Sequence, residues 1–113
     1  MALEVTHIRF ALDILERYQV NSLREYLSGT IYPDSRYVTR IDRNLTHNKH
    51  ILGQHFSQSD FTSGWQVHCI CDEVQRDVHQ KLFPDFHTYG GSKKWIYLTA
   101  LKLFEHSALR ADF

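Results

Sequence analysis

The stretch that decides the fold runs from Ser59 to Pro84 and reads SDFTSGWQVHCICDEVQRDVHQKLFP. Its apolar residues recur at helical spacing: Phe61, Trp65, Val67, Ile70, Val74 and Val78. Ser59 or Asp60 is a suitable N-cap, and Pro84 stops the helix because proline has no backbone N–H to continue it. The sequence therefore predicts a long amphipathic helix from Phe61 to about Leu82.

Two side chains on this helix are of the kind that bind metal ions. His68 and Asp72 are four residues apart, so both project from one face, and Gln75 and His79 continue the same stripe. A nitrogen and an oxygen one turn apart can chelate a divalent ion without bending the backbone. An ordinary surface hydrogen bond uses the same spacing. Bulky apolar neighbours such as Trp65 favour partial burial, where a carboxylate needs a partner or a metal.

The rest of the chain also carries helical patterns. Further helices are expected from Val5 to Tyr18, Leu23 to Leu27, Thr46 or Asn48 to about Phe56, and Ser92 to about Ala108. Asn21-Ser22 supplies the N-cap of the second of these, and Gly29 ends it. Because no segment alternates apolar and polar residues over a strand's length, the predicted fold is all-α, a compact bundle of about five helices.

Composition limits what the chain can be. The 113 residues, 42% hydrophobic and 23% charged, fit one helical domain, residues 1–113, and are too apolar for disorder. The net charge of zero argues against a strongly basic nucleic-acid binder. No apolar run is long enough for a transmembrane segment. Cys69 and Cys71 cannot form a disulfide framework and are interpreted as core residues, so we expect a cytoplasmic protein; a homo-oligomer fits so small a domain.

Residues 29–46 resemble a functional loop. Pro33-Asp34 is a pair of residues typical of turns, and arginines are interspersed with aromatic residues along the loop. Arg36 and Arg40 are candidates to hold a substrate phosphate through planar, bidentate contacts, and Arg43 follows them. Solvated surface charges explain the same arginines equally well.

Three more ligand-type residues precede the His68–Asp72 pair: His7, Asp34 and His47. Each has an ordinary alternative explanation, as a core histidine, a turn-capping aspartate and a surface histidine respectively. Taken together, three histidines and two aspartates form a nitrogen and oxygen donor set that suits zinc, iron or manganese better than calcium.

The order of these motifs resembles zinc-dependent phospholipase C and the related single-strand nucleases. The resemblance covers residues 5–72 and rests on Thr6-His7 with Phe10-Ala11, Tyr26-Leu27-x-Gly29 leading to Pro33-Asp34, Thr46-His47, and Gly64-Trp65-x-x-His68-x-x-x-Asp72. It implies an all-α fold that gathers zinc ions. One zinc would be held by Asp34, His47, His68 and Asp72, and another by His7 together with Asp72. It also makes Asp34 the candidate general base and His79 a candidate ligand of a further metal.

The chain departs from that family in three respects. It begins Met1-Ala2-Leu3, whereas the family uses the free amine of a processed tryptophan as a zinc ligand. A second, later His-x-x-x-Asp/Glu pair is missing, with only Glu105-His106 near the end. Family members are also much longer, so the chain is expected to be a short member or a piece of a longer protein.

The predicted function is metal-dependent hydrolysis of a phosphate ester, from a small molecule or a lipid. A metal-dependent phosphohydrolase of the HD type would need adjacent His-Asp, which the sequence does not contain. A di-iron bundle needs two Glu-x-x-His motifs, and only Glu4-x-x-His7 is present. The alternative of a different class is a non-catalytic helical protein with a structural metal or an interaction role.

Overall fold

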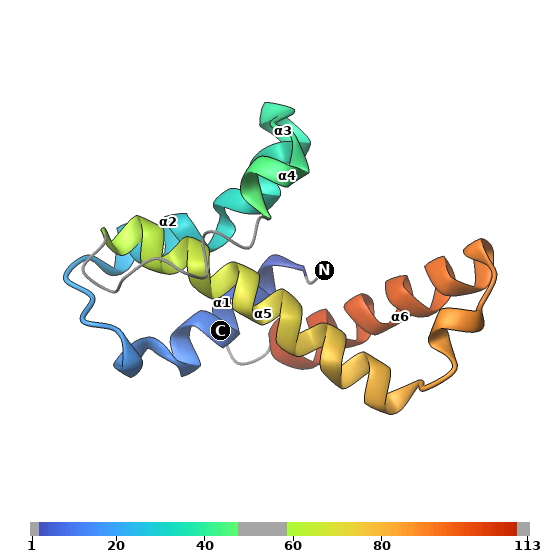
Figure 1. Cartoon of the computed structure of the whole chain (residues 1–113). Helices are drawn as coiled ribbons and strands as arrows, with labels where there is room; N and C mark the ends of the chain where they lie inside the picture. The colour runs from blue at the N-terminus through green and yellow to red at the C-terminus, as the bar shows by residue number, and fades with distance from the viewer. Residues whose placement is uncertain (1–2, 48–58, 111–113) are drawn as a thin grey trace.

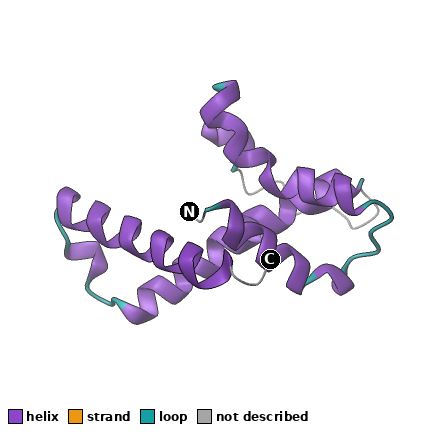
Figure 2. Ribbon diagram, turned by 180° about the vertical axis from the view of Figure 1, so that it is seen from behind, coloured by secondary structure: helices purple, strands orange, loops and turns teal. Residues whose placement is uncertain are grey.

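The long helix predicted after Ser59 is present as α5, Asp60–Leu82, and it is the central element of the molecule. The computed structural model describes residues 3–47 and 59–110. The other elements are α1 (Glu4–Asp13), η1 (Leu15–Arg17), α2 (Leu23–Ile31), η2 (Tyr32–Ser35), α3 (Arg36–Thr39), α4 (Arg43–Thr46), η4 (Phe86–Thr88) and α6 (Gly91–Leu109), where η marks a 3₁₀ helix. Within the described residues every regular element is helical (Figure 2). The all-α prediction is confirmed.

The arrangement is built on the crossing of α2 and α5, which lie side by side (Figure 1). A Cβ atom added at Gly29 would lie 1.9 Å from the Phe61 carbonyl oxygen, and one at Gly64 would lie 1.9 Å from that of Tyr26. The two helix backbones therefore meet where only glycine leaves room. The expectation that Gly29 ends the second helix is wrong: the residue lies inside α2, buried against α5.

A small apolar core lies beside this crossing. Ala11, Tyr26 and Val67 are completely buried, and the Tyr26 hydroxyl donates a 2.8 Å hydrogen bond to the Ala11 carbonyl. This bond fixes α1 to α2, and α1 also packs against α5. Ser22 caps α2 by accepting from the Glu25 N–H, as the sequence predicts. The α1–α2–α5 unit is thus the packed part of the molecule.

Two predicted helix boundaries and one predicted loop need correction. The first helix ends at Asp13 and continues only as η1, and α6 begins at Gly91 with Gly90 as its N-cap, ahead of Ser92. Residues 29–46 are largely a series of short helical turns: Pro33 lies in the first turn of η2, and Asp42 caps α4 through the Asn44 N–H. The short helix predicted through about Phe56 falls on residues 48–58, which lie outside the described part of the chain.

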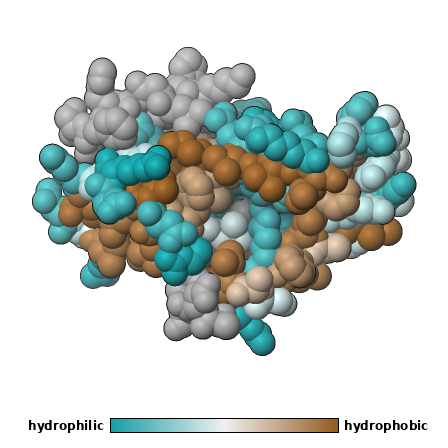
Figure 3. All heavy atoms as spheres, turned by 90° about the horizontal axis from the view of Figure 1, so that it is seen from below, coloured by the Kyte–Doolittle hydropathy of each residue, from teal (hydrophilic) through white to brown (hydrophobic). Residues whose placement is uncertain are grey.

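The second half of α5 and α6 form a more open hairpin, with α6 running back toward α1 (Figure 1). Along α5, the side chains of Gln75 and His79 are buried, whereas Val74 and Val78 are 44% and 47% exposed. None of the residues of α6 is buried. Apolar side chains consequently gather in a band across one face of the molecule (Figure 3). Each helix within residues 3–47 and 59–110 is too short or too polar to span a lipid bilayer.

Candidate metal centre

All five predicted ligand residues meet at one place. His7 comes from α1, Asp34 from η2, His47 directly follows α4, and His68 and Asp72 come from α5. Two overlapping groups, His7–His68–Asp72 and Asp34–His47–His68, each offer ligand atoms that lie within 4.8 Å of one another. The fold therefore gathers residues that are far apart in the sequence into one cluster that could hold a metal ion.

The two carboxylates occupy the middle of this cluster. Asp72 lies 3.3 Å from His7 Nε2, 3.4 Å from His68 Nε2 and 3.6 Å from His47 Nε2. Asp34 lies 3.9, 3.6 and 3.8 Å from the same three nitrogens. Each histidine thus presents Nε2 to both aspartates, a convergence that an isolated surface hydrogen bond does not require.

His68 is oriented by the backbone of α2. Its Nδ1 lies 2.7 Å from the Thr30 carbonyl oxygen, which can only accept, so Nδ1 carries a proton and Nε2 is the nitrogen whose lone pair can bind a metal. The His68 ring also stacks on that of His7, with centroids 3.7 Å apart.

His47 is oriented in the same sense by Thr46. The Thr46 hydroxyl donates its proton to the Arg43 carbonyl, so its oxygen accepts from His47 Nδ1 at 2.8 Å. Trp65 Nε1 holds the Thr46 carbonyl at 2.6 Å, which fixes this segment against α5. Nε2 of His47 therefore also presents a lone pair.

These two orientations leave Nε2 of His47 and Nε2 of His68 facing each other at 3.2 Å. Two lone pairs at that distance repel unless a proton or a cation lies between them. Burial, and after it the neighbouring His68, lowers the pKa of His47 to about 4, so the His47 ring is neutral at neutral pH. A cation shared by the two nitrogens would remove this repulsion.

The carboxylates and the remaining histidine point to the same conclusion. Burial raises the pKa of Asp34, whereas at Asp72 the neighbouring His68 and His7 outweigh burial and keep the pKa below its ordinary value. His7 is 1% exposed, and within the described residues neither of its ring nitrogens makes a hydrogen bond. The Asp34 Oδ1 atom is also buried and makes no hydrogen bond within the described residues. Unsatisfied buried donors and acceptors of this kind fit a metal site.

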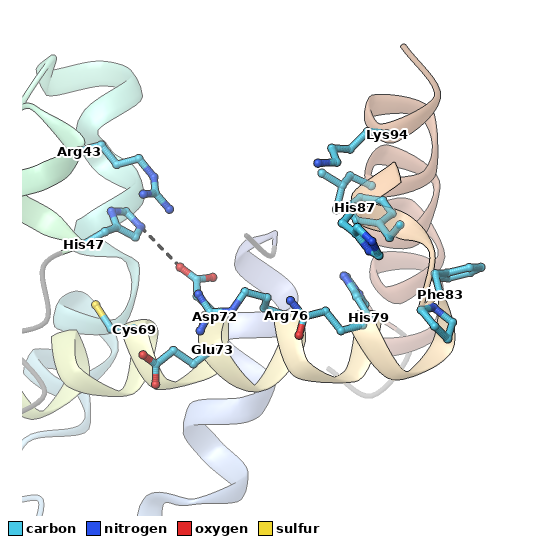
Figure 4. Close-up of a pocket in the computed structure, with 14 residues that line it drawn as sticks. Arg43, His47, Cys69, Asp72, Glu73, Arg76, His79, Phe83, His87 and Lys94 are labelled. Carbon is cyan, nitrogen blue, oxygen red and sulfur yellow. Dashed lines mark ion pairs between the residues drawn. The ribbon is translucent and has the colours of Figure 1, made fainter. Parts of the chain in front are cut away.

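One side of the cluster opens into a cleft of about 840 Å³ that runs along α5 (Figure 4). His47 and Asp72 form the edge that faces this cleft. The cations that line it are Arg43 from α4, Arg76 from α5 and Lys94 from α6.

The two arginines predicted to hold phosphate do not line this cleft. Arg36 is half-buried at the start of α3, and Arg40 is exposed just after α3, in a left-handed conformation with φ of 61°. Arg76 was not among the residues predicted from the sequence to bind phosphate. Its position one turn after Asp72 on the same helix is the signal that could have identified it.

His79, the candidate for a further metal, lies in a different cluster. Its Nε2 is 3.5 Å from Glu105 of α6, and Glu105 also accepts hydrogen bonds from Gln75 at 2.7 Å and Thr6 at 3.1 Å. This cluster offers one histidine and one carboxylate, and it ties α6 to α5 and α1. The cysteines have no part in either cluster: Cys69 and Cys71 are buried, as expected, and burial raises the pKa of each thiol to about 12.

Comparisons of the chain with protein-family models, with curated proteins and with solved structures found no match.

Proposed function

We propose that the protein is a metal-dependent hydrolase that acts on a phosphate ester. The observation that carries this proposal is the edge of the His/Asp cluster formed by His47 and Asp72, which opens into a cleft lined by cations. A buried donor set alone would fit any metal protein. A donor set beside an accessible, positively charged cleft fits a site where an anionic substrate reaches the ion.

The ligands would be His7, Asp34, His47, His68 and Asp72. Neutral imidazole nitrogens with carboxylate oxygens favour zinc, with iron or manganese as the other candidates. A divalent ion in such a site supplies Lewis-acid polarisation of the phosphoryl group and lowers the pKa of water bound to it.

Two residues of the chain would carry the remaining steps. Asp34 is 9% exposed and lies beside all three histidines. Burial raises its pKa, which makes it a better proton acceptor near neutral pH and suits the role of general base. Arg43, on the cleft wall next to His47 (Figure 4), would bind a phosphoryl oxygen through its planar guanidinium. The resemblance to zinc-dependent phospholipase C and the single-strand nucleases supports the same role for Asp34.

A structural metal is the second candidate function, favoured by the number of protein ligands. Five protein donors are enough to fill a coordination sphere, and structural zinc sites are closed in that way. In that case the protein would hold the ion tightly and hydrolyse nothing. The cleft edge at His47 and Asp72 favours the catalytic alternative.

The proposal is tested first by elemental analysis of protein purified without a histidine tag and without added metal. We expect about one equivalent or more of zinc, iron or manganese. The His68→Ala variant should lose it, because His68 belongs to both ligand groups. His87→Ala is the matched control, since His87 is an exposed histidine that lines the same cleft outside the cluster.

Activity is then measured with bis(4-nitrophenyl) phosphate and 4-nitrophenyl phosphate. Asp34→Asn should abolish turnover while an amide oxygen remains in place of the carboxylate, and His87→Ala should retain it. Metal bound without hydrolysis of either ester would favour the structural alternative. Wild-type and His68→Ala protein with equal metal affinity would refute the metal centre itself.

A further inference from the structure

The cleft extends well beyond the metal centre. Along α5 its lining runs from Cys69 to Gln80, about 16 Å of helix, and Phe83 just after the helix lines it as well. A phosphoryl group bound at the metal would occupy only the end beside His47 and Asp72. The remaining length must accommodate the rest of the substrate, so the groups that line it carry information about the substrate's chemistry.

Cations outnumber carboxylates along the whole cleft. Arg43 and Lys94 enter the cleft from opposite walls, above the face of α5 that carries Arg76 (Figure 4). Within the described residues none of these three side chains forms an ion pair. The carboxylates that line the cleft are Asp72, which belongs to the metal centre, and Glu73, its neighbour. The α6 wall therefore carries a cation, Lys94, that pairs with no carboxylate among residues 3–47 and 59–110.

Lys94 differs from an ordinary surface lysine. Its side chain is half-buried, and its Nζ lies 5.3 Å from the centre of the Phe86 ring, which also lines the cleft. That contact holds the ammonium group in place on the α6 wall. The preceding residue, Lys93, instead lies 4.1 Å over the Tyr89 ring and does not line the cleft. These two adjacent lysines thus have the same charge, lie on the same helix and each contact an aromatic ring, but only Lys94 lines the cleft.

We propose that the substrate is a phosphoester that carries a second anionic group, and that Lys94 binds this group on the wall opposite Arg43. The phosphoryl group lies at the metal centre, with Arg43 and Arg76 beside it, and the second group reaches across the cleft to Lys94. This inference rests on the proposed function, because it takes the metal centre as the place where the phosphoryl group binds. Lys94 is then a specificity-determining residue that discriminates between monoanionic and dianionic substrates.

The test uses non-hydrolysable probes and metal-loaded protein, with calorimetry as the readout. ω-Carboxyalkylphosphonates with two to eight methylene groups are compared with ω-hydroxyalkylphosphonates of the same length. At the length that spans the cleft, the carboxylate should strengthen binding about fivefold over the hydroxyl. Lys94→Gln should remove this gain and leave hydroxyalkylphosphonate binding and metal content unchanged. Lys93→Gln, the matched control, should keep the gain.

The outcomes separate this inference from the proposed function. If hydroxyalkylphosphonates bind in a metal-dependent way but the carboxylate strengthens binding at no chain length, the second-anion site is refuted and the metal centre stands. A gain that survives in Lys94→Gln equally refutes the assignment of Lys94. If no phosphonate binds to metal-loaded protein, the phosphoester site itself is refuted, and the inference with it.

Discussion

The two halves of α5 lie in different surroundings. The first half crosses α2 at Gly29 and Gly64, and its buried side chains include Val67 and His68. The second half pairs with α6, none of whose residues is buried, and leaves Val74 exposed. One continuous helix therefore passes from a tightly packed region, where the candidate metal ligands gather, to a hairpin whose apolar side chains remain in contact with solvent.

The difference shows that the burial of a side chain on α5 depends more on how closely two helix backbones approach each other than on whether the side chain is hydrophobic. Where glycines bring two helices together, polar groups such as His68 and Thr30 become completely buried and must bond to each other. Where the helices meet through long side chains, Gln75 and His79 are buried around Glu105 while valines one position away remain exposed. The candidate metal centre lies in the region with the closest backbone packing.

The largest effect that would sharpen this contrast is metal binding. Zinc at about a thousandfold over its Kd should stabilise the protein by about 4 kcal/mol, because only the folded chain assembles the five ligands. Thermal unfolding with and without a chelator measures the shift. His68→Ala should lose the response to zinc. Phe104→Ser, an exposed position on α6, should keep it.

Gly64→Ala should break the packed region. The new Cβ atom would lie 1.9 Å from the Tyr26 carbonyl oxygen, so the helices must separate at a cost of about 3 kcal/mol. Urea unfolding measures the change in the free energy of unfolding. Gly91→Ala is the control, since a Cβ atom there meets nothing within 4 Å. Equal stabilities for the two variants would show that the crossing is looser than described.

Two valines on the same helix allow a matched comparison. Val67 is completely buried and Val74 is 44% exposed. Val67→Ala should lower the free energy of unfolding by about 2 kcal/mol through lost burial and a residual cavity. Val74→Ala should change it by less than about 0.5 kcal/mol. Similar losses at both positions would mean that the exposed face of α5 is covered in solution, which sedimentation would detect as self-association.

The smallest effect concerns the attachment of α6. Glu105→Ala removes the acceptor shared by Thr6, Gln75 and His79, and should cost about 1–2 kcal/mol. Amide hydrogen exchange should accelerate along α6 and remain slow across the α2–α5 crossing. Glu105→Gln keeps one acceptor oxygen and should lie between the wild type and Glu105→Ala. Uniform acceleration over the whole chain would mean that the two regions unfold as one unit.

The sequence was informative about the site because ligand chemistry and helical spacing are local properties. The pair His68 and Asp72 follows from a four-residue interval, and the start of α5 follows from Ser59 as a cap. The arginines were harder to place. Arg36 and Arg40 lie in the same segment as Asp34, but which side chains line the cleft depends on how α4, α5 and α6 are arranged, and that arrangement adds Arg76 and Lys94.

The sequence by itself determined the all-α class, the extent of α5 and the identity of five candidate ligands, because helical periodicity, capping and donor type are encoded over a few residues. Only the tertiary structure decided that Gly29 continues its helix rather than ending it, that Val74 is exposed while Gln75 is buried, and that Lys94 lines the same cleft as His47 and Asp72. Each of these depends on contacts between helices distant in the chain. Such contacts are set by backbone approach and side-chain volume at the crossing, which no local pattern records.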